Sequence, residues 1–117
     1  MSNDTYTHED AGILLVLVTC PEDRSESIAS ALLESNLAAC INIISQVKSF
    51  YRWQGEVQQD NESLMLIKCS PDNYRALEER VLGMHPYELP EIISVSVAGG
   101  LPDYLNWVLH PDKNKSE

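Results

Sequence analysis

The chain has 117 residues, which is the length of one domain, and its 44% hydrophobic and 22% charged residues match ordinary globular proteins. Eighteen acidic residues against eight basic ones leave a formal net charge of -10. Because binding to nucleic acid depends on Lys and Arg that displace counterions from phosphates, this balance excludes nucleic acid as a main partner. An acidic surface attracts cations, although weakly and without selectivity.

The cysteine pattern and the start of the chain bear on the compartment. Cys20, Cys40 and Cys69 form no C-x-x-C pair, and an odd number of cysteines cannot complete a disulfide set. A reducing cytoplasm is therefore the expected location. The first residues lack the basic region of a secretory signal peptide, and the best apolar run, 13–18, is far shorter than the ~20 residues of a membrane span. We expect no membrane partner.

The first elements of the domain are a strand and a helix. The apolar run 13–18 is typical of a strand buried on both faces. Asp23 and Glu26, three residues apart, match a capping box at the start of a helix over 24–35. Asn36 is placed to close that helix in the left-handed conformation.

The rest of the chain predicts three more strands and two more helices. Ser70 and Pro71 supply the N-cap and the first-turn proline of the second helix. The remaining predicted elements are, in order, a strand over 37–53 that bends near Ser45, a reversal at Gln54 and Gly55, a strand from Glu56 to Ile67, a helix over 71–82 ended by Gly83, a strand over 92–97 and a helix over 102–108. The side chains expected to face the core from the second helix are those of Tyr74, Leu77, Val81 and Leu82.

This order of elements predicts one α+β domain over 12–110, with flexible tails at 1–11 and 111–117. Two interleaved βαβ units in one antiparallel sheet, with both helices on one face, form the ferredoxin-like split βαβ fold. The second and third strands are longer than such a sheet can pair internally, and Tyr51 and Trp53 lie near their tips. Because a projecting hairpin exposes unpaired backbone and apolar surface, its length predicts self-association.

Six segments of the chain resemble the CutA divalent-cation-tolerance family in order and spacing. They are 16–21, 37–43, 49–56, 66–68, 85–93 and 104–107, of which the stretch HPYELPE at 85–91 is the most specific. The resemblance implies a ferredoxin-like fold, a PII-like homotrimer whose long hairpins pair between subunits, and a role in tolerance to divalent cations, copper above all. No catalysed reaction is established for the family as a whole, and we expect no enzymatic activity.

The strongest candidate site lies in the HPYELPE stretch. His85, Glu88 and Glu91 offer one imidazole and two carboxylates, a mixture suited to copper, zinc or nickel, and two prolines restrict the backbone around Tyr87. We therefore predict Cu²⁺ or another divalent cation at His85, with no organic cofactor evident. The alternative is structural: the carboxylates cap backbone amides or pair with Lys68, and His85 ends the second helix at the surface.

Other residues carry weaker signals. Lys68 ends an apolar strand, where a cation needs a counter-charge or an anionic ligand. Tyr51 and Trp53 suit either stacking on a ligand or anchoring a subunit interface, and the interface is favoured. Cys40, in an apolar strand, is expected to be a buried small hydrophobe.

The leading hypothesis is a non-enzymatic trimer of copper tolerance that binds a metal ion or small ligand in clefts between subunits. The residues predicted to line the cleft are Lys68, Tyr87, Glu88 and Glu91, with His85 as metal ligand and Tyr51 and Trp53 contributed across the interface. A second hypothesis is a PII-like regulator whose ligand controls an unknown partner protein, with metal incidental. A third is an enzyme that uses the same cleft, although the chain holds no nucleophile elbow, phosphate loop or zinc-protease motif.

Overall fold

The computed structural model describes residues 12–112, so the predictions for residues 1–11 and 113–117 lie outside the described residues. The strands are β1 (Leu14–Cys20), β2 (Cys40–Trp53), β3 (Glu56–Cys69) and β4 (Ile92–Ser96). The helices are α2 (Ser25–Glu34), α3 (Tyr74–Met84) and α4 (Pro102–Leu109), with the short 3-10 turns η1 (Glu22–Arg24) and η2 (Pro71–Asn73) leading into α2 and α3. None of the helices described is long and apolar enough to cross a membrane.

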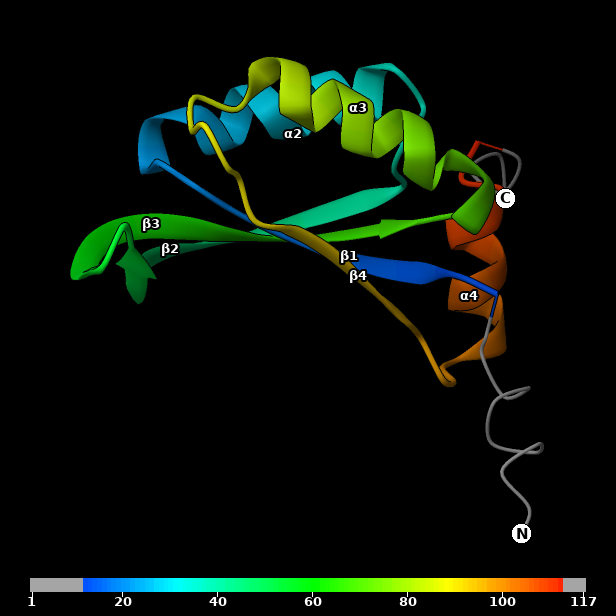
Figure 1. Ribbon diagram of the computed structural model, residues 1–117. Helices are drawn as coiled ribbons and strands as arrows, with labels where there is room; N and C mark the ends of the chain where they lie inside the picture. The colour runs from blue at the N-terminus through cyan, green and yellow to red at the C-terminus, as the bar shows by residue number, and fades with distance from the viewer. Residues whose placement is uncertain (1–11, 113–117) are drawn as a thin grey trace, which may run out of the picture.

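The four strands form one antiparallel sheet in the order β2-β3-β1-β4. Figure 1 shows α2 and α3 side by side over one face of the sheet, while α4 stands at one end of it. The order of elements and the placing of both helices on one face confirm the ferredoxin-like split βαβ prediction.

The β2–β3 hairpin extends well past the rest of the sheet (Figure 1). The pairing of β1 with β3 ends where Cys20 lies opposite Ser63. Residues 56–62 of β3 therefore pair with β2 alone. A register shift between Ile44 and Val47 bends β2, which confirms the bend predicted near Ser45. Gln54 and Gly55 close the hairpin with φ values of 52° and 85°, the left-handed pair that a two-residue turn needs.

The ends of α2 show one correct and one wrong prediction. Asn36 has φ 60°, and the amides of Asn36 and Leu37 donate to the carbonyls of Leu33 and Leu32, which is a Schellman cap. The predicted capping box is wrong, because α2 starts with no side-chain cap. Its first residue, Ser25, is buried and its hydroxyl donates backwards to the carbonyl of Glu22 in η1.

The second helix also differs in part from its prediction. Ser70 caps it as predicted, with its hydroxyl accepting from the amide of Asp72. Gly83 does not end the helix, which continues to Met84. Leu82 is 52% exposed and not in the core, because it lies beside Val81 on the helix surface, about 100° around the axis from the buried stripe.

The hydrophobic core lies entirely between the sheet and α2 and α3. It is built from alternate residues of the strands and the inner faces of the two helices, among them Val16, Val18, Met65, Ile67, Ile28, Leu32, Leu77 and Val81. The alternate residues of the same strands form the opposite face, where Leu17 of β1 lies between Leu66 of β3 and Ile93 of β4. No described element covers that apolar face, and Ile93 and Val95 are 49% and 46% exposed there.

A pair of leucines on α3 tests where its core face lies. Leu77→Ala should lower the free energy of unfolding by about 2–5 kcal/mol, because it opens a cavity beneath a fully buried side chain. Leu82→Ala, on the exposed side of the same helix, should change it by less than about 0.5 kcal/mol. Urea unfolding at one fixed protein concentration measures both, and equal losses would contradict the observed orientation of α3.

Candidate functional site at the root of the hairpin

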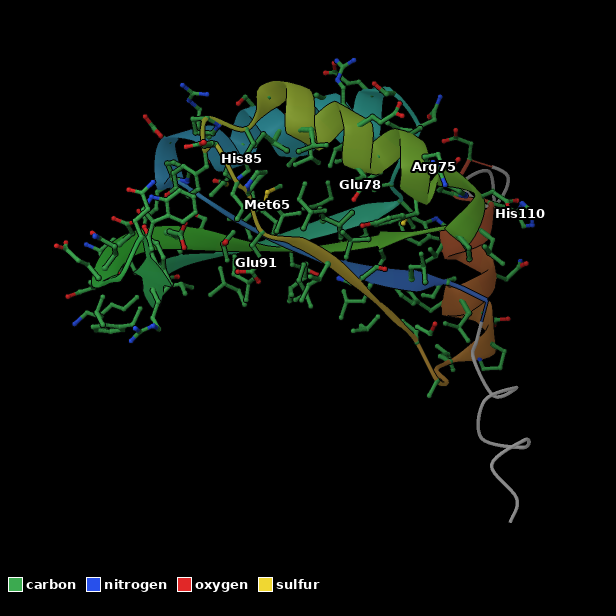
Figure 2. All side chains as sticks on the ribbon, viewed as in Figure 1. Met65, Arg75, Glu78, His85, Glu91 and His110 are labelled. Atoms are coloured by element: carbon green, nitrogen blue, oxygen red, sulfur yellow. The ribbon has the colours of Figure 1, made fainter. Side chains whose placement is uncertain are left out.

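His85 leaves α3 in an extended conformation, with its amide still bonded to the carbonyl of Val81 at 2.8 Å. Its ring is buried on the helix side of the sheet, and Figure 2 shows it at the end of α3. Nε2 lies 2.7 Å from the carbonyl oxygen of Thr19, so it must carry the proton and donate. Nδ1 accepts from the amide of Tyr87 at 3.2 Å. His85 is therefore a neutral imidazole with both nitrogens engaged, and not a surface residue.

This histidine places Tyr87 over the root of the hairpin. The two rings pack 4.9 Å apart between their centroids, tilted by 59°. The carboxylate of Glu62 on β3 lies close enough to the hydroxyl of Tyr87 to act on its ionisation. Burial, followed by this carboxylate and the negative charge of Asp60, raises the pKa of the Tyr87 phenol well above its usual value. Tyr87 thus keeps its proton beside Glu62, a carboxylate that is only 4% exposed.

A second tyrosine and a second carboxylate lie beside this pair. The hydroxyl of Tyr51 on β2 donates to Asp60 on β3, and this bond is the first cause of a raised pKa at Tyr51. Asp60 and Glu62 are two residues apart on one strand, so they share a face of the hairpin. The negative charge on both carboxylates acts on Tyr87. The site therefore brings two phenols beside two carboxylates, and one of the phenols, Tyr51, donates to Asp60.

Thr19, at the end of β1, joins this site to the rest of the HPYELPE loop. Its carbonyl accepts from His85, while its hydroxyl donates to the Oε1 atom of Glu91 at 3.3 Å. Glu88 is exposed in the same loop. Trp53 lies two residues beyond Tyr51 at the end of β2, half-buried opposite Glu56.

Lys68 lies in a different place from the other predicted site residues. It is six residues along β3 from Glu62, which corresponds to about 20 Å of strand. Its Nζ atom contacts the amide oxygen of Asn42 and lies 3.9 Å from the sulfur of Cys40. The predicted pairing of Lys68 with the loop glutamates is therefore wrong within one chain, since each strand position fixes its side chain near its own cross-strand neighbours.

The described residues contain no group of three or more His, Cys, Asp and Glu side chains arranged to hold a metal ion. Burial raises the pKa of the Cys20 thiol to about 11, with smaller contributions from Glu62 and Asp23, and burial raises that of Cys69 to about 11. Both thiols are therefore protonated near neutral pH and poor ligands. Cys40 is half-buried at the start of β2, and not buried as predicted.

A cavity of about 220 Å³ lies at the opposite end of the sheet, between α4 and the ends of α2 and β3. The residues that line it include Asn36, Ala38, Ser70, Asn73 and Val108, and none of the predicted site residues. The cleft proposed from the sequence is not enclosed by one copy of the described chain.

Sequence reasoning missed Thr19, Asp60 and Glu62. The available signal was the polar half of β3, where Asp60 and Glu62 alternate immediately before an apolar run. Two carboxylates on one face of a strand, next to an apolar core, require partners. The sequence could not name those partners, because Tyr87 comes from a loop beyond α3.

Comparisons with known proteins place this geometry in one family. The model of the CutA1 divalent ion tolerance protein family matches residues 14–110. The divalent-cation tolerance protein CutA of Thermus thermophilus is 46% identical over 95 residues, covering 80% of this chain and 92% of that protein. A solved structure from the same organism superimposes with a TM-score of 0.81 at 45% identity, covering 83% of this chain and 95% of that one. The PII-like protein CutA from Nostoc, in apo form, gives a TM-score of 0.78 at 34% identity, covering 82% and 93%.

The raised pKa of Tyr87 predicts a loss of stability at alkaline pH. The folded protein binds this proton more tightly than the unfolded chain, whose tyrosines ionise near pH ~10, so the contribution is complete below that pH and is lost as the pH rises further. Chemical unfolding measured between about pH 9 and 11 should show a steeper fall for the wild type than for Tyr87→Phe. Tyr51→Phe, at an exposed tyrosine, serves as the comparison and should leave most of the slope. Equal slopes for the wild type and Tyr87→Phe would contradict the buried placement of the Tyr87 hydroxyl beside Glu62.

Proposed function

We propose that this chain, which belongs to the CutA1 divalent ion tolerance family, works as a cytoplasmic homotrimer without enzymatic activity. In this proposal the trimer binds a divalent cation or a small ligand in the clefts between its subunits. In this role the protein contributes to tolerance of divalent cations, copper above all. The observation that carries the proposal is the pair of carboxylates at the root of the hairpin, Asp60 and Glu62, each of which lies beside a tyrosine hydroxyl.

The chemistry of this site favours a cation. Carboxylate oxygens bind hard divalent cations, and Cu²⁺ binds most nitrogen and oxygen sites more tightly than its neighbours in the first transition row do. The hydroxyl of Tyr51 orients Asp60, as residues behind a metal ligand commonly do. One described chain supplies too few ligands to complete a metal site, so a neighbouring subunit would supply the remainder.

Two features support the trimer. The sheet face opposite the helices carries Leu17, Leu66 and Ile93 in adjacent strands with no covering element among the described residues. The hairpin also exposes Phe50 and Val57, at 66% and 67%. Apolar surfaces and strand edges of this kind are usually covered by another chain. The family resemblance implies that the other chains are two further copies.

The protonation states at the site support binding over catalysis. His85 is held as a neutral imidazole by hydrogen bonds at both nitrogens. The phenol pKa values of Tyr51 and Tyr87 are both raised, away from neutral pH. A general base or acid works best with a pKa near the operating pH, so these two phenols suit a fixed binding site better than proton transfer.

His85 as a metal ligand stays a prediction. A metal could reach Nε2 only if the ring gave up its hydrogen bond to Thr19, which would also move Tyr87 away from Glu62. Glu88 and Glu91 lie on the same loop and would accompany that movement.

A PII-like regulatory role is the second candidate, and the structural likeness to the Nostoc protein that is described as PII-like favours it. In this version, a ligand at the root of the hairpin changes the position of the hairpin, and a partner protein responds to that change. The two candidates differ in the ligand, which is a metal ion in the first and a small organic effector in the second.

Isothermal titration with Cu²⁺ and Zn²⁺ tests the cation site. Asp60→Asn and Glu62→Gln should each weaken binding by at least about tenfold, equivalent to ~1.4 kcal/mol, because each removes one charged oxygen ligand. Asp103→Asn, an exposed acidic position on α4 at the other end of the sheet, should bind as the wild type does.

Binding of copper by itself would prove little, because many acidic proteins bind it. Uptake that is unchanged in Asp60→Asn and Glu62→Gln but lost in His85→Ala would move the site to the predicted histidine. Uptake that no variant alters would contradict a specific metal site and favour the organic effector.

A further inference from the structure

The end of the sheet away from the hairpin holds two adjoining hollows beside α4, which we call together the α4 cavity. Their volumes are about 220 Å³ and 290 Å³, and the residues that line both are Asn36, Ala38, Ala39, Pro111 and Asp112. Figure 1 shows the end of α4 next to the start of α3. None of the described residues that line the α4 cavity belongs to the uncovered sheet face or to the outer half of the hairpin. The surfaces assigned to the trimer therefore leave this cavity open.

The walls of the α4 cavity are largely apolar, and its size suits a small molecule. Ala38 and Val108 line it and are only 8% and 3% exposed. The side chain of Trp107 lines the second hollow, and its ring packs 5.7 Å from that of Tyr104. Each hollow is smaller than the ~300 Å³ at which sites for drug-sized ligands begin, so the occupant must be smaller than such a ligand.

The electrostatic surroundings of the α4 cavity favour a positive charge. The C-terminal ends of two helices meet there, since Asn36 closes α2 and Leu109 is the last residue of α4. Each such end carries roughly half a negative charge. Asp112 adds a carboxylate, and the described residues that line the cavity include no Lys or Arg. The N-terminal end of α3 also lies there, but Ser70 caps it and Asp72 stands in its first turn.

The polar atoms in the wall are matched to a ligand that donates hydrogen bonds. The side-chain nitrogen of Asn73 donates to the carbonyl of Asn36 at 3.4 Å. The oxygen of the same side chain is the atom that remains for a ligand, and it is an acceptor. The carboxylate of Asp112 is also an acceptor. A ligand with N–H groups would satisfy both.

We propose that the α4 cavity binds a small organic cation, with an ammonium or guanidinium group beside Asp112 and an apolar part against Ala38 and Val108. The cation completes a charge-assisted hydrogen bond to the carboxylate and is attracted by the two helix ends. A tryptophan such as Trp107 adds attraction for a positive charge placed over its ring. This site is separate from the carboxylates at the root of the hairpin, so the proposal does not rest on the proposed function.

Three probes of nearly equal size and shape but different charge test the proposal. They are benzylammonium, benzyl alcohol and benzoate, each titrated into the full-length protein at neutral pH and followed by ligand-observed NMR. Benzylammonium should bind most tightly, benzyl alcohol several-fold more weakly, and benzoate most weakly of the three. Equal affinities for the three probes, or no binding of benzylammonium, would overturn the proposal.

A pair of matched variants locates the bound cation. Asp112→Asn should weaken the binding of benzylammonium several-fold and leave that of benzyl alcohol nearly unchanged. Asp103→Asn removes the same charge at the exposed start of α4 and should bind both probes as the wild type does. Ala39→Leu, at a half-buried position that lines both hollows, should weaken the binding of both probes by filling the space. Wild-type affinity for benzylammonium in both Asp112→Asn and Ala39→Leu would place the cation elsewhere and contradict the inference.

Lys113 and Lys115 follow Asp112 in the sequence, and their ammonium groups are the competing occupants that the chain itself offers. A double variant, Lys113→Ser with Lys115→Ser, should bind benzylammonium no more than a few-fold more tightly than the wild type does. Binding that is seen only in this variant would overturn the proposal, because it would show that the lysines of the chain fill the cavity and exclude a separate ligand.

Discussion

A four-stranded sheet with apolar residues on both faces, but helices on only one, is the constraint on which the rest of this structure depends. α2 and α3 bury one face, while Leu17, Leu66 and Ile93 remain open on the other. Burial of apolar surface gains about 25 cal/mol per Å², so leaving that face in water would forgo a large part of the available stabilisation. One chain thus buries only one of the two apolar faces of its sheet, and other copies of the chain are the natural means of burying the second. The outer half of the long hairpin pairs with no other strand between residues 12 and 112, so it presents the same requirement at its edge.

The loop between α3 and β4 connects this scaffold to its candidate site. His85 is fixed by the carbonyl of Thr19, and its ring then positions Tyr87 on Glu62. Asp60, farther along the same strand, is held by Tyr51. Both carboxylates stand where the hairpin leaves the body of the sheet. In the proposed trimer, a cation or effector bound there would act directly on the element that reaches toward other subunits, so binding and assembly would be coupled by position.

Local chemistry was predictable from the sequence, and contacts between distant segments were not. Asn36 as a left-handed cap and Ser70 as an N-cap depend on the few residues around them, and both were correct. The family resemblance and the alternation of strands and helices were enough for the fold. The structural alternative for His85, a histidine at the surface, was wrong, because its hydrogen-bond partner, Thr19, lies 66 residues away and no local pattern points to it. Glu62 was missed for the same reason, since the tyrosine beside it belongs to a loop whose path the sequence pattern does not define.

Native mass spectrometry of the wild-type chain at micromolar concentration is the most direct test of the requirement for other copies. The proposed trimer predicts one dominant species with three times the 13.1 kDa chain mass, stable on dilution, because the apolar faces and hairpins would cover one another. A folded monomer under these conditions would contradict the account, since it would show that this sheet face is stable in water without a partner. A dimer would retain the covered face but contradict the three-fold arrangement.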